Sequence, residues 1–214
     1  MELNKQVVIV GCGPGGAAYL TGMALKAAER AKVLVGTAKL LGLFPETGTR
    51  IELKRIETEP IAKLIAGLDC DRVAVLVSGD TGIYSLASSL RRLAPADWEV
   101  SFVPGISSIQ AACALFTLEW QEMRFFSLHC RSATAELAET AARGEKPLAI
   151  LCGPGNEPGR IARDLLAVIE PDRVCRVACD IGSKEQVTWC GTLAGLAGKT
   201  LSAHAVLIID GRKK

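Results

Sequence analysis

A glycine-rich run near the start of the chain is the first feature suited to chemistry. Residues 11–16 read GCGPGG, follow a short apolar segment and satisfy the spacing GxGxxG. In a turn between a strand and a helix, this spacing is typical of dinucleotide binding, because glycines let the backbone approach a pyrophosphate. This interpretation predicts a nicotinamide or flavin oxidoreductase. It also requires an acidic residue at the end of the second strand, about 20 residues further on.

The sequence lacks the residues that would complete a dinucleotide site. The second apolar segment, 32–35, continues into 36–38, which read GTA, and the next acidic residue is Glu46. Pro14 lies inside the first turn and has no backbone N–H to offer a phosphate. An oxidoreductase therefore remains only an alternative, as does a plain strand-to-helix turn without ligand.

Two further loops combine glycine with polar side chains. Residues 78–85 read SGDTGIYS and follow the most apolar segment, 72–78, at the carboxyl end where parallel sheets bind ligands. Asp80 adds a negative charge to this loop. Residues 103–108 read VPGISS, and serine hydroxyls and amides at a helix start suit a carboxylate or a ribose. We therefore expect three strand ends to form one ligand site.

The three loops together resemble those of the tetrapyrrole methylase family, whose members transfer methyl groups from S-adenosylmethionine to precorrins and related macrocycles. The matching motifs are GxGPG in the first loop, GDxxxY in the second and PGISS in the third. Residues 127–131, SLHCR, and 151–154, LCGP, extend the resemblance over nearly the whole chain. Within the family, these motifs are most similar to those of the carbon 5 methyltransferases that act on cobalt-precorrin-7 in cobalamin biosynthesis.

The resemblance implies two α/β domains with S-adenosylmethionine in the cleft between them, and a homodimer. It also implies ten cofactor contacts, at Pro14, Ser78, Gly79, Asp80, Ile83, Ser107, Ser108, Cys152, Gly182 and His204. The implied substrate contacts are Gly13, His129 and Arg131. Two positions depart from the family pattern: Thr81, where many relatives have proline, and Cys130, where glycine is expected. A separate carbon 15 methyltransferase is a further implied partner.

The implied reaction depends more on positioning the two reactants than on activating either of them. The sulfonium methyl of S-adenosylmethionine is already electrophilic, and in-line placement of a carbon nucleophile can supply ~7–11 kcal/mol of the barrier. We assign catalytic roles to Asp80, which would orient the cofactor, and to Tyr84, which would flank the methyl channel. The alternatives are that Asp80 caps the following helix and that Tyr84 is half-buried on that helix. Arg131 suits a macrocycle carboxylate or a surface ion pair, and His129 suits the substrate or a hydrogen bond at the domain interface.

Short β-branched runs alternate with segments of helical period, a pattern typical of an α/β protein. The first set predicts strands at 6–10, 32–36, 50–53, 72–78 and 99–103, and helices at 17–30, 57–68, 83–93 and 107–116. A second set of strands is predicted at 123–128, 148–151, 174–177, 186–189 and 205–209. The expected architecture is a domain at 1–118 with a mostly parallel sheet and a domain at 119–214 with a smaller mixed sheet.

Composition narrows the class of protein. The 214 residues are 49% hydrophobic, which is ample for a packed core, yet no apolar run approaches the length of a membrane span. The first residues lead directly into a strand, so we expect a cytoplasmic protein. A net charge of +2 argues against nucleic-acid binding. The eight cysteines form no CxxC pair and the histidines number two, so we expect buried thiols and no metal site.

Three functional classes therefore remain open from the sequence. The first is a methyltransferase, including members of the same superfamily that act on sirohaem precursors, diphthamide or ribosomal RNA. The second is an oxidoreductase that binds its cofactor through the first glycine loop. The third is a tetrapyrrole-binding protein without catalytic activity.

Overall fold

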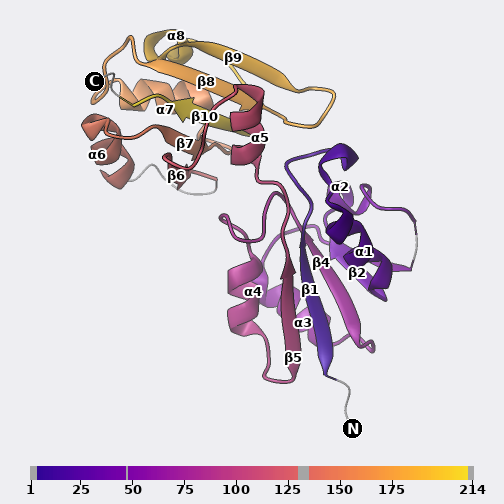
Figure 1. The fold of residues 1–214 in the computed structure, drawn as a ribbon. Coiled ribbons are helices and arrows are strands. Elements are labelled where there is room, and N and C mark those ends of the chain that lie inside the picture. The colour runs from indigo at the N-terminus through magenta and orange to yellow at the C-terminus, as the bar shows by residue number, and fades with distance from the viewer. Residues whose placement is uncertain (1–3, 47, 130–134, 212–214) are drawn as a thin grey trace. The chain divides into compact units, whose positions relative to one another are not determined.

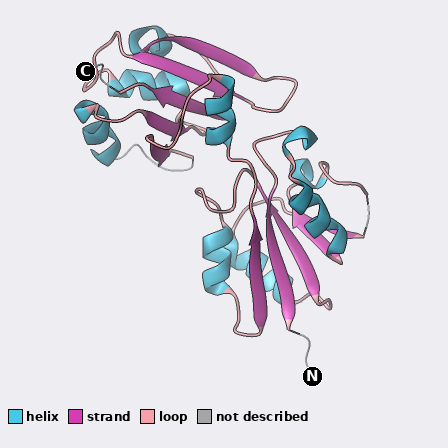
Figure 2. Cartoon of the chain, viewed as in Figure 1, coloured by secondary structure: helices cyan, strands magenta, loops and turns pink. Residues whose placement is uncertain are grey.

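The computed structural model describes residues 4–46, 48–129 and 135–211, and its contacts divide the chain into two compact units. The first unit comprises 1–107 and the second 108–214. Each unit contains a β-sheet covered by helices (Figures 1 and 2). The two expected α/β domains are thus present, with the division placed before residue 108 rather than after 118.

The first unit contains a five-stranded sheet in which all the strands are parallel. Its strands are β1 (Lys5–Gly11), β2 (Val33–Gly36), β3 (Thr49–Glu52), β4 (Arg72–Val77) and β5 (Trp98–Val103). Their order across the sheet is β3-β2-β4-β1-β5. The structure confirms the five strands that the β-branched runs predicted. Such runs suit a sheet that is buried on both faces.

Helices cover both faces of this sheet. They are α1 (Gly22–Arg30), α2 (Ala38–Leu41), α3 (Thr58–Ala66) and α4 (Ala87–Leu93), with a short 3-10 turn, η1, at Ala17–Tyr19. Alternate residues of β1 point to opposite faces. Ile9 lies in one buried cluster with Ile61 and Leu90, whereas Val10 lies in another with Ala24. This period of two places a hydrophobic core on each side of the sheet.

Two expected helices begin later than the sequence pattern indicated. The segment 17–30 is divided into η1 and α1, because Thr21 caps α1 by accepting a hydrogen bond at 3.1 Å from the Ala24 N–H. The segment 83–93 forms a helix only from Ala87 onward. Tyr84 has a φ of 48°, in the left-handed region, and this conformation interrupts a right-handed helix.

The second unit contains a mixed five-stranded sheet, so the expected mixed character is confirmed, but the sheet is not smaller by strand number. Its strands are β6 (Arg124–Ser127), β7 (Leu148–Leu151), β8 (Val174–Cys179), β9 (Val187–Thr192) and β10 (Ala205–Ile209). Their order is β6-β7-β10-β8-β9, and only β6 and β7 run parallel among the described pairs.

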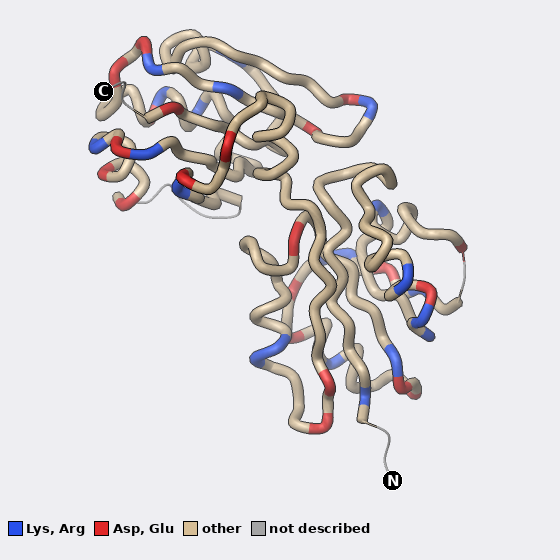
Figure 3. Tube along the Cα trace, viewed as in Figure 1, with Lys and Arg blue, Asp and Glu red and all other residues tan. Residues whose placement is uncertain are grey.

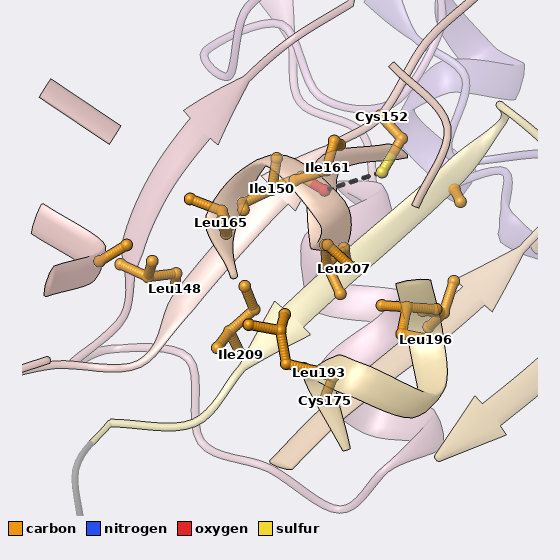
Figure 4. Close-up of a cluster of buried hydrophobic side chains, with 14 of the residues drawn as sticks. Leu148, Ile150, Cys152, Ile161, Leu165, Cys175, Leu193, Leu196, Leu207 and Ile209 are labelled. Atoms are coloured by element: carbon orange, nitrogen blue, oxygen red, sulfur yellow. Dashed lines mark hydrogen bonds between the residues drawn. The ribbon is translucent and has the colours of Figure 1, made fainter. Parts of the chain in front are cut away.

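A dense apolar core joins this sheet to its helices (Figure 4). The helices are α5 (Ser108–Leu115), α6 (Ala135–Arg143), α7 (Pro158–Leu165) and α8 (Leu193–Ala197). Ile150 and Leu207 of the sheet pack with Ile161, Leu165 and Leu193 of the helices. Helix α5 contacts β8 and β10, which explains why it belongs to this unit and why the division lies before 108.

The lengths of the helices and the distribution of charged residues agree with the composition of the sequence. In the described ranges, every helix is too short or too polar to cross a lipid bilayer. Lysine and arginine alternate with aspartate and glutamate along the described trace of both units (Figure 3). Charges of both signs therefore occur throughout the two folds.

Candidate functional site

Three loops of the first unit begin side by side at the carboxyl edge of its sheet. Strand β1 lies between β4 and β5 and is parallel to both. Gly11 is in register with Val77, and Val10 with Val103, so the three strands end at the same level (Figure 1). Ligands of open parallel sheets bind at such ends. The expected convergence of three strand ends is confirmed.

Direct backbone hydrogen bonds join the first loop to the second. The Gly79 N–H donates to the Gly13 carbonyl at 2.8 Å, and the Gly13 N–H donates to the Gly79 carbonyl at 3.1 Å. Just before this pair, the Cys12 N–H donates to the Val77 carbonyl at 2.9 Å. An isolated antiparallel bridge between Gly13 and Gly79 thus follows the parallel pairing of β1 with β4, and it fixes the relative position of the two loops.

Two glycines, Gly11 and Gly105, allow the backbones of the three loops to touch. A Cβ added to Gly105 would lie 2.2 Å from the Gly79 carbonyl oxygen and 2.6 Å from the Gly11 carbonyl carbon. A Cβ added to Gly11 would lie 2.5 Å from the Gly105 nitrogen. Both contacts are closer than real Cβ atoms allow. The loops can therefore pack this tightly only because these positions have no side chain.

Gly79 has a different reason to be glycine. Its φ of 64° lies in the left-handed region, and a Cβ built there would have no neighbour within 4 Å. The backbone at Gly79 is thus open on one side and held by Gly13 on the other. An exposed backbone of this kind lets a ligand approach closely.

The carboxylate of Asp80 accepts hydrogen bonds from two backbone amides in two different loops. Oδ1 accepts from the Gly82 N–H at 2.7 Å, and Oδ2 accepts from the Gly105 N–H at 3.1 Å. The alternative that Asp80 caps the next helix is wrong, because α4 begins at Ala87 and its N-cap position is Leu86. Asp80 instead links its own loop to the loop that follows β5.

The other expected residues of this unit differ in accessibility. Ser78 is exposed, and Pro14 and Ile83 are half-buried. Ser107 is only 2% exposed, and Thr81, at the position where relatives have proline, is 6% exposed. Tyr84 is 49% exposed and lies in the loop before α4, so the alternative that it lies on that helix is wrong. Its exposed ring is available to a ligand at this edge.

The dinucleotide interpretation finds little support in this geometry. In Rossmann sheets the strand order is 3-2-1-4-5, whereas here β4 separates β2 from β1. The first glycine loop leads into η1, and α1 begins only at Gly22. Because Thr21 already caps α1, the N-terminus of that helix does not follow the glycine turn as a pyrophosphate site requires.

In the second unit, candidate residues gather at one end of the mixed sheet. Ser127 is in register with Leu151 and Ala205 with Cys179, so β6, β7 and β8 end where β10 begins. The expected site residues at this end are His129, Cys152, Gly182 and His204, while Ser108 of the same unit begins α5. The Cys152 N–H donates to the Ala205 carbonyl at 2.9 Å, and the Asp180 N–H donates to the His204 carbonyl at 2.8 Å.

The loop that follows β7 packs closely on the loop that follows β6. A Cβ added to Gly153 would lie 2.8 Å from the Cα of His129 and 2.9 Å from its Nδ1 atom. The side-chain amide of Asn156 donates to the Leu128 carbonyl at 2.9 Å. His129 itself is exposed, so its ring is accessible beside this glycine loop. Arg131 and Cys130 lie outside the described residues.

The buried cysteines of the site are not activated. Burial raises the pKa of the Cys12 thiol to about 12, against the pull of its backbone hydrogen bond to Val77. Burial also raises the pKa of Cys152. Both are protonated thiols at neutral pH, and a protonated thiol is a poor nucleophile. Any contact of Cys152 with a ligand would be through its backbone, because its side chain belongs to the apolar core.

Sequence reasoning overlooked residues that shape the site without displaying reactive groups. Gly11, Gly105, Gly153 and Asn156 determine how closely the loops approach, yet none was among the contacts expected of a methyltransferase. The signal for the glycines was present, since each lies in a motif that matched the family. The link from Asp80 to Gly105 was not predictable, because it joins residues 25 positions apart in the chain.

Comparison with known proteins agrees with this arrangement. The family model for tetrapyrrole (corrin/porphyrin) methylases matches residues 6–197. The chain belongs to the tetrapyrrole methylase family. The three loops thus belong to a chain of a methyltransferase family, and the oxidoreductase alternative is not favoured.

Two curated relatives and one solved structure are similar to this chain. The cobalt-precorrin-7 C(5)-methyltransferase of Salmonella typhimurium is 27% identical over 207 residues, which cover 96% of this chain and all of the relative. The probable cobalt-precorrin-7 C(5)-methyltransferase of Methanocaldococcus jannaschii is 31% identical over 126 residues, 58% of this chain and 60% of the relative. The uroporphyrin-III C-methyltransferase of Thermus thermophilus, solved with S-adenosylhomocysteine, has a TM-score of 0.76 at 21% identity and covers 96% of this chain and 97% of that chain.

Proposed function

We propose that this tetrapyrrole methylase is an S-adenosylmethionine-dependent C-methyltransferase that acts at carbon 5 of a precorrin or cobalt-precorrin in cobalamin biosynthesis. The end-to-end match with a cobalt-precorrin-7 C(5)-methyltransferase supports the choice of substrate. The observation that carries the proposal is the close packing of Gly11, Gly79 and Gly105 at the carboxyl edge of the parallel sheet. This packing exposes backbone and hydroxyl groups where such sheets bind ligands.

The residues at this edge fit the cofactor. Gly79 leaves open space beside its backbone, and Ser78 and Gly82 are exposed next to it. S-adenosylmethionine carries an amino acid group and ribose hydroxyls, which suit backbone and hydroxyl partners of this kind, and when bound it supplies an electrophilic methyl group. Ser78, Gly79 and Ile83 would hold it from the first unit, with Pro14 beside them. Further proposed contacts are those implied by the resemblance, at Ser107, Ser108, Cys152, Gly182 and His204.

The chain's part in catalysis would be to position the reactants. Among the described residues, the buried site thiols are protonated, so we assign no step to a cysteine nucleophile. Tyr84, exposed in the second loop, would flank the path of the methyl group. Gly13, His129 and Arg131 are the proposed substrate contacts, with Arg131 pairing with a carboxylate of the macrocycle. Holding the reacting carbon in line with the methyl group is the main source of rate enhancement in this scheme.

Calorimetric titration tests the cofactor. We expect S-adenosylhomocysteine to bind one site per chain, and NADH to give no heat of binding under the same conditions. Binding of NADH without binding of S-adenosylhomocysteine would reject the methyltransferase proposal and favour the oxidoreductase.

A turnover assay tests the substrate. Purified protein with S-adenosylmethionine should add one methyl group to cobalt-precorrin-7, as recorded by mass spectrometry, with the position assigned by NMR. If the protein binds S-adenosylhomocysteine but leaves this substrate unchanged, the carbon 5 assignment fails and the family membership stands. Assembly as a homodimer, a cytoplasmic location and cooperation with a separate carbon 15 methyltransferase belong to the same proposal.

A further inference from the structure

We infer that Asp80 is a positioning residue: its carboxylate fixes the loop after β4 to the loop after β5 before any ligand binds. The inference deepens the proposed function, on which its binding and turnover readouts rest. It replaces the direct contact with cofactor that the resemblance implies for this residue. The two hydrogen bonds from Gly82 and Gly105 to the carboxylate are called the Asp80 link below.

Sheet topology explains why a side chain is needed at this place. Strand β1 lies between β4 and β5, so those two strands share no ladder of hydrogen bonds. The backbone hydrogen bonds described for Gly79 join the β4 loop to the β1 loop, where Gly13 is their partner. The Asp80 link joins the β4 loop to the β5 loop, beside the end of β1 at Gly11.

The glycine contacts show that the loops joined by the Asp80 link lie in direct backbone contact. Gly105 lies so close to the Gly79 carbonyl and to Gly11 that neither Gly105 nor Gly11 can bear a Cβ. Packing of this kind holds a loop only weakly by itself, because dispersion between a few atoms is small. The carboxylate adds a directional, charge-assisted bond to the Gly105 N–H. Without Asp80, that half-buried amide would lose its partner.

The chemistry of the link identifies the substitution that tests it. Each carboxylate oxygen accepts one backbone N–H in the ligand-free protein, and each retains a second acceptor site. An amide at this position offers a single acceptor oxygen and would place its NH2 group against one of two N–H donors. Asp80→Asn therefore breaks half of the link while leaving size and shape unchanged. Asp97, exposed in the loop before β5, offers a matched control as Asp97→Asn.

Hydrogen exchange of the ligand-free full chain, followed by NMR, tests the link directly. In the wild-type protein we expect the Gly105 amide to be protected. In Asp80→Asn we expect the Gly105 or Gly82 amide to exchange at least about tenfold faster, with Val8 and Ile9 of β1 unchanged, and Asp97→Asn to match the wild type. Rapid exchange of Gly105 in the wild-type protein would overturn the inference even if the variant fails to fold.

Binding and kinetics supply the second readout. We expect Asp80→Asn to weaken S-adenosylhomocysteine binding by roughly tenfold and to raise the KM for S-adenosylmethionine, with kcat within about twofold of wild type. Asp80→Glu, which keeps two acceptors, should recover part of the loss. Weaker binding in Asp80→Asn with unchanged exchange at Gly105 and Gly82 would show direct contact and overturn the inference. If wild-type protein binds no S-adenosylhomocysteine, the proposed function fails, while the exchange experiment still decides the Asp80 link.

Discussion

At the scale of single residues, Gly105 is the position where the site tolerates least change. A methyl group there would lie 2.2 Å from the Gly79 carbonyl oxygen, which is backbone and cannot rotate away. We expect Gly105→Ala to destabilise the protein by ~1–3 kcal/mol, as overpacking does, and to reduce S-adenosylhomocysteine binding. Urea unfolding monitored by circular dichroism, together with calorimetry, measures both effects.

Gly22→Ala is the matched control for this substitution. Gly22 begins α1, and a Cβ there would have no neighbour within 4 Å. Alanine also favours helix by up to about 1 kcal/mol over glycine, so this variant should be as stable as wild type or more so. Equal stability of the two variants would contradict the close packing described for Gly105.

The thiols give a second residue-scale prediction. Burial raises the pKa of Cys12 and of Cys175 from the ordinary cysteine value of 9.0 to about 12. Labelling with a thiol reagent at pH 8 should therefore modify the exposed Cys190 in the native protein and reach Cys12 and Cys175 only after unfolding. Because their folded pKa is raised, their contribution to stability is present below pH 9 and is lost as the pH rises toward 12. Mass mapping that finds Cys12 labelled as quickly as Cys190 would reject this account.

At the scale of elements, a lysine holds the C-terminal end of α3 to β1. The Lys5 ammonium donates to the Ile65 carbonyl at 2.8 Å and to the Leu68 carbonyl at 2.6 Å. A cation at a helix C-terminus satisfies carbonyls that have no partner within the helix. We expect Lys5→Met, which keeps the apolar stem, to cost about 1–2 kcal/mol of unfolding free energy. Lys63→Met, exposed in the last turn of the same helix, should cost less than half as much by urea unfolding.

Strands such as β1 and β4 were predictable because their apolar residues indicate burial directly. Runs such as 7–10 and 73–77 are apolar at every position, as a sheet covered on both faces requires. Helix boundaries were less predictable. The four residues of α2 are too few to show a period, and α4 starts late because the backbone at Tyr84 is left-handed, which side-chain type does not reveal.

The site was predictable as a set of loops but not as a set of contacts. The motifs placed Ser78, Gly79 and Asp80 correctly at one sheet edge, since the carboxyl ends of parallel strands lie together. They did not show that Ser107 is buried or that Asp80 faces Gly105. Both facts depend on how segments that are far apart in the chain pack against each other. A sequence motif does not show that packing.

At the scale of the whole molecule, assembly can be measured without reference to the site. The family resemblance predicts a homodimer of the 22.6 kDa chain. Sedimentation equilibrium at micromolar concentration should therefore give twice the mass of one chain. The mass of a single chain across that range would contradict the prediction, while binding of S-adenosylhomocysteine by the monomer would leave the cofactor proposal intact.

Ligand binding at the site should raise the thermal stability of the whole protein. A ligand that binds only the folded state stabilises it by RT ln(1 + [L]/Kd), about 2.7 kcal/mol at a concentration 100 times Kd. S-adenosylhomocysteine at that excess should therefore raise the midpoint of thermal unfolding by several degrees, whereas NADH at equal concentration should not. In Gly105→Ala the same total concentration should raise the midpoint less, because the loops that form the site no longer pack as they do in wild type. A shift with NADH and none with S-adenosylhomocysteine would overturn the methyltransferase proposal. An equal shift in wild type and Gly105→Ala would keep the cofactor but place its binding site away from the three glycine loops.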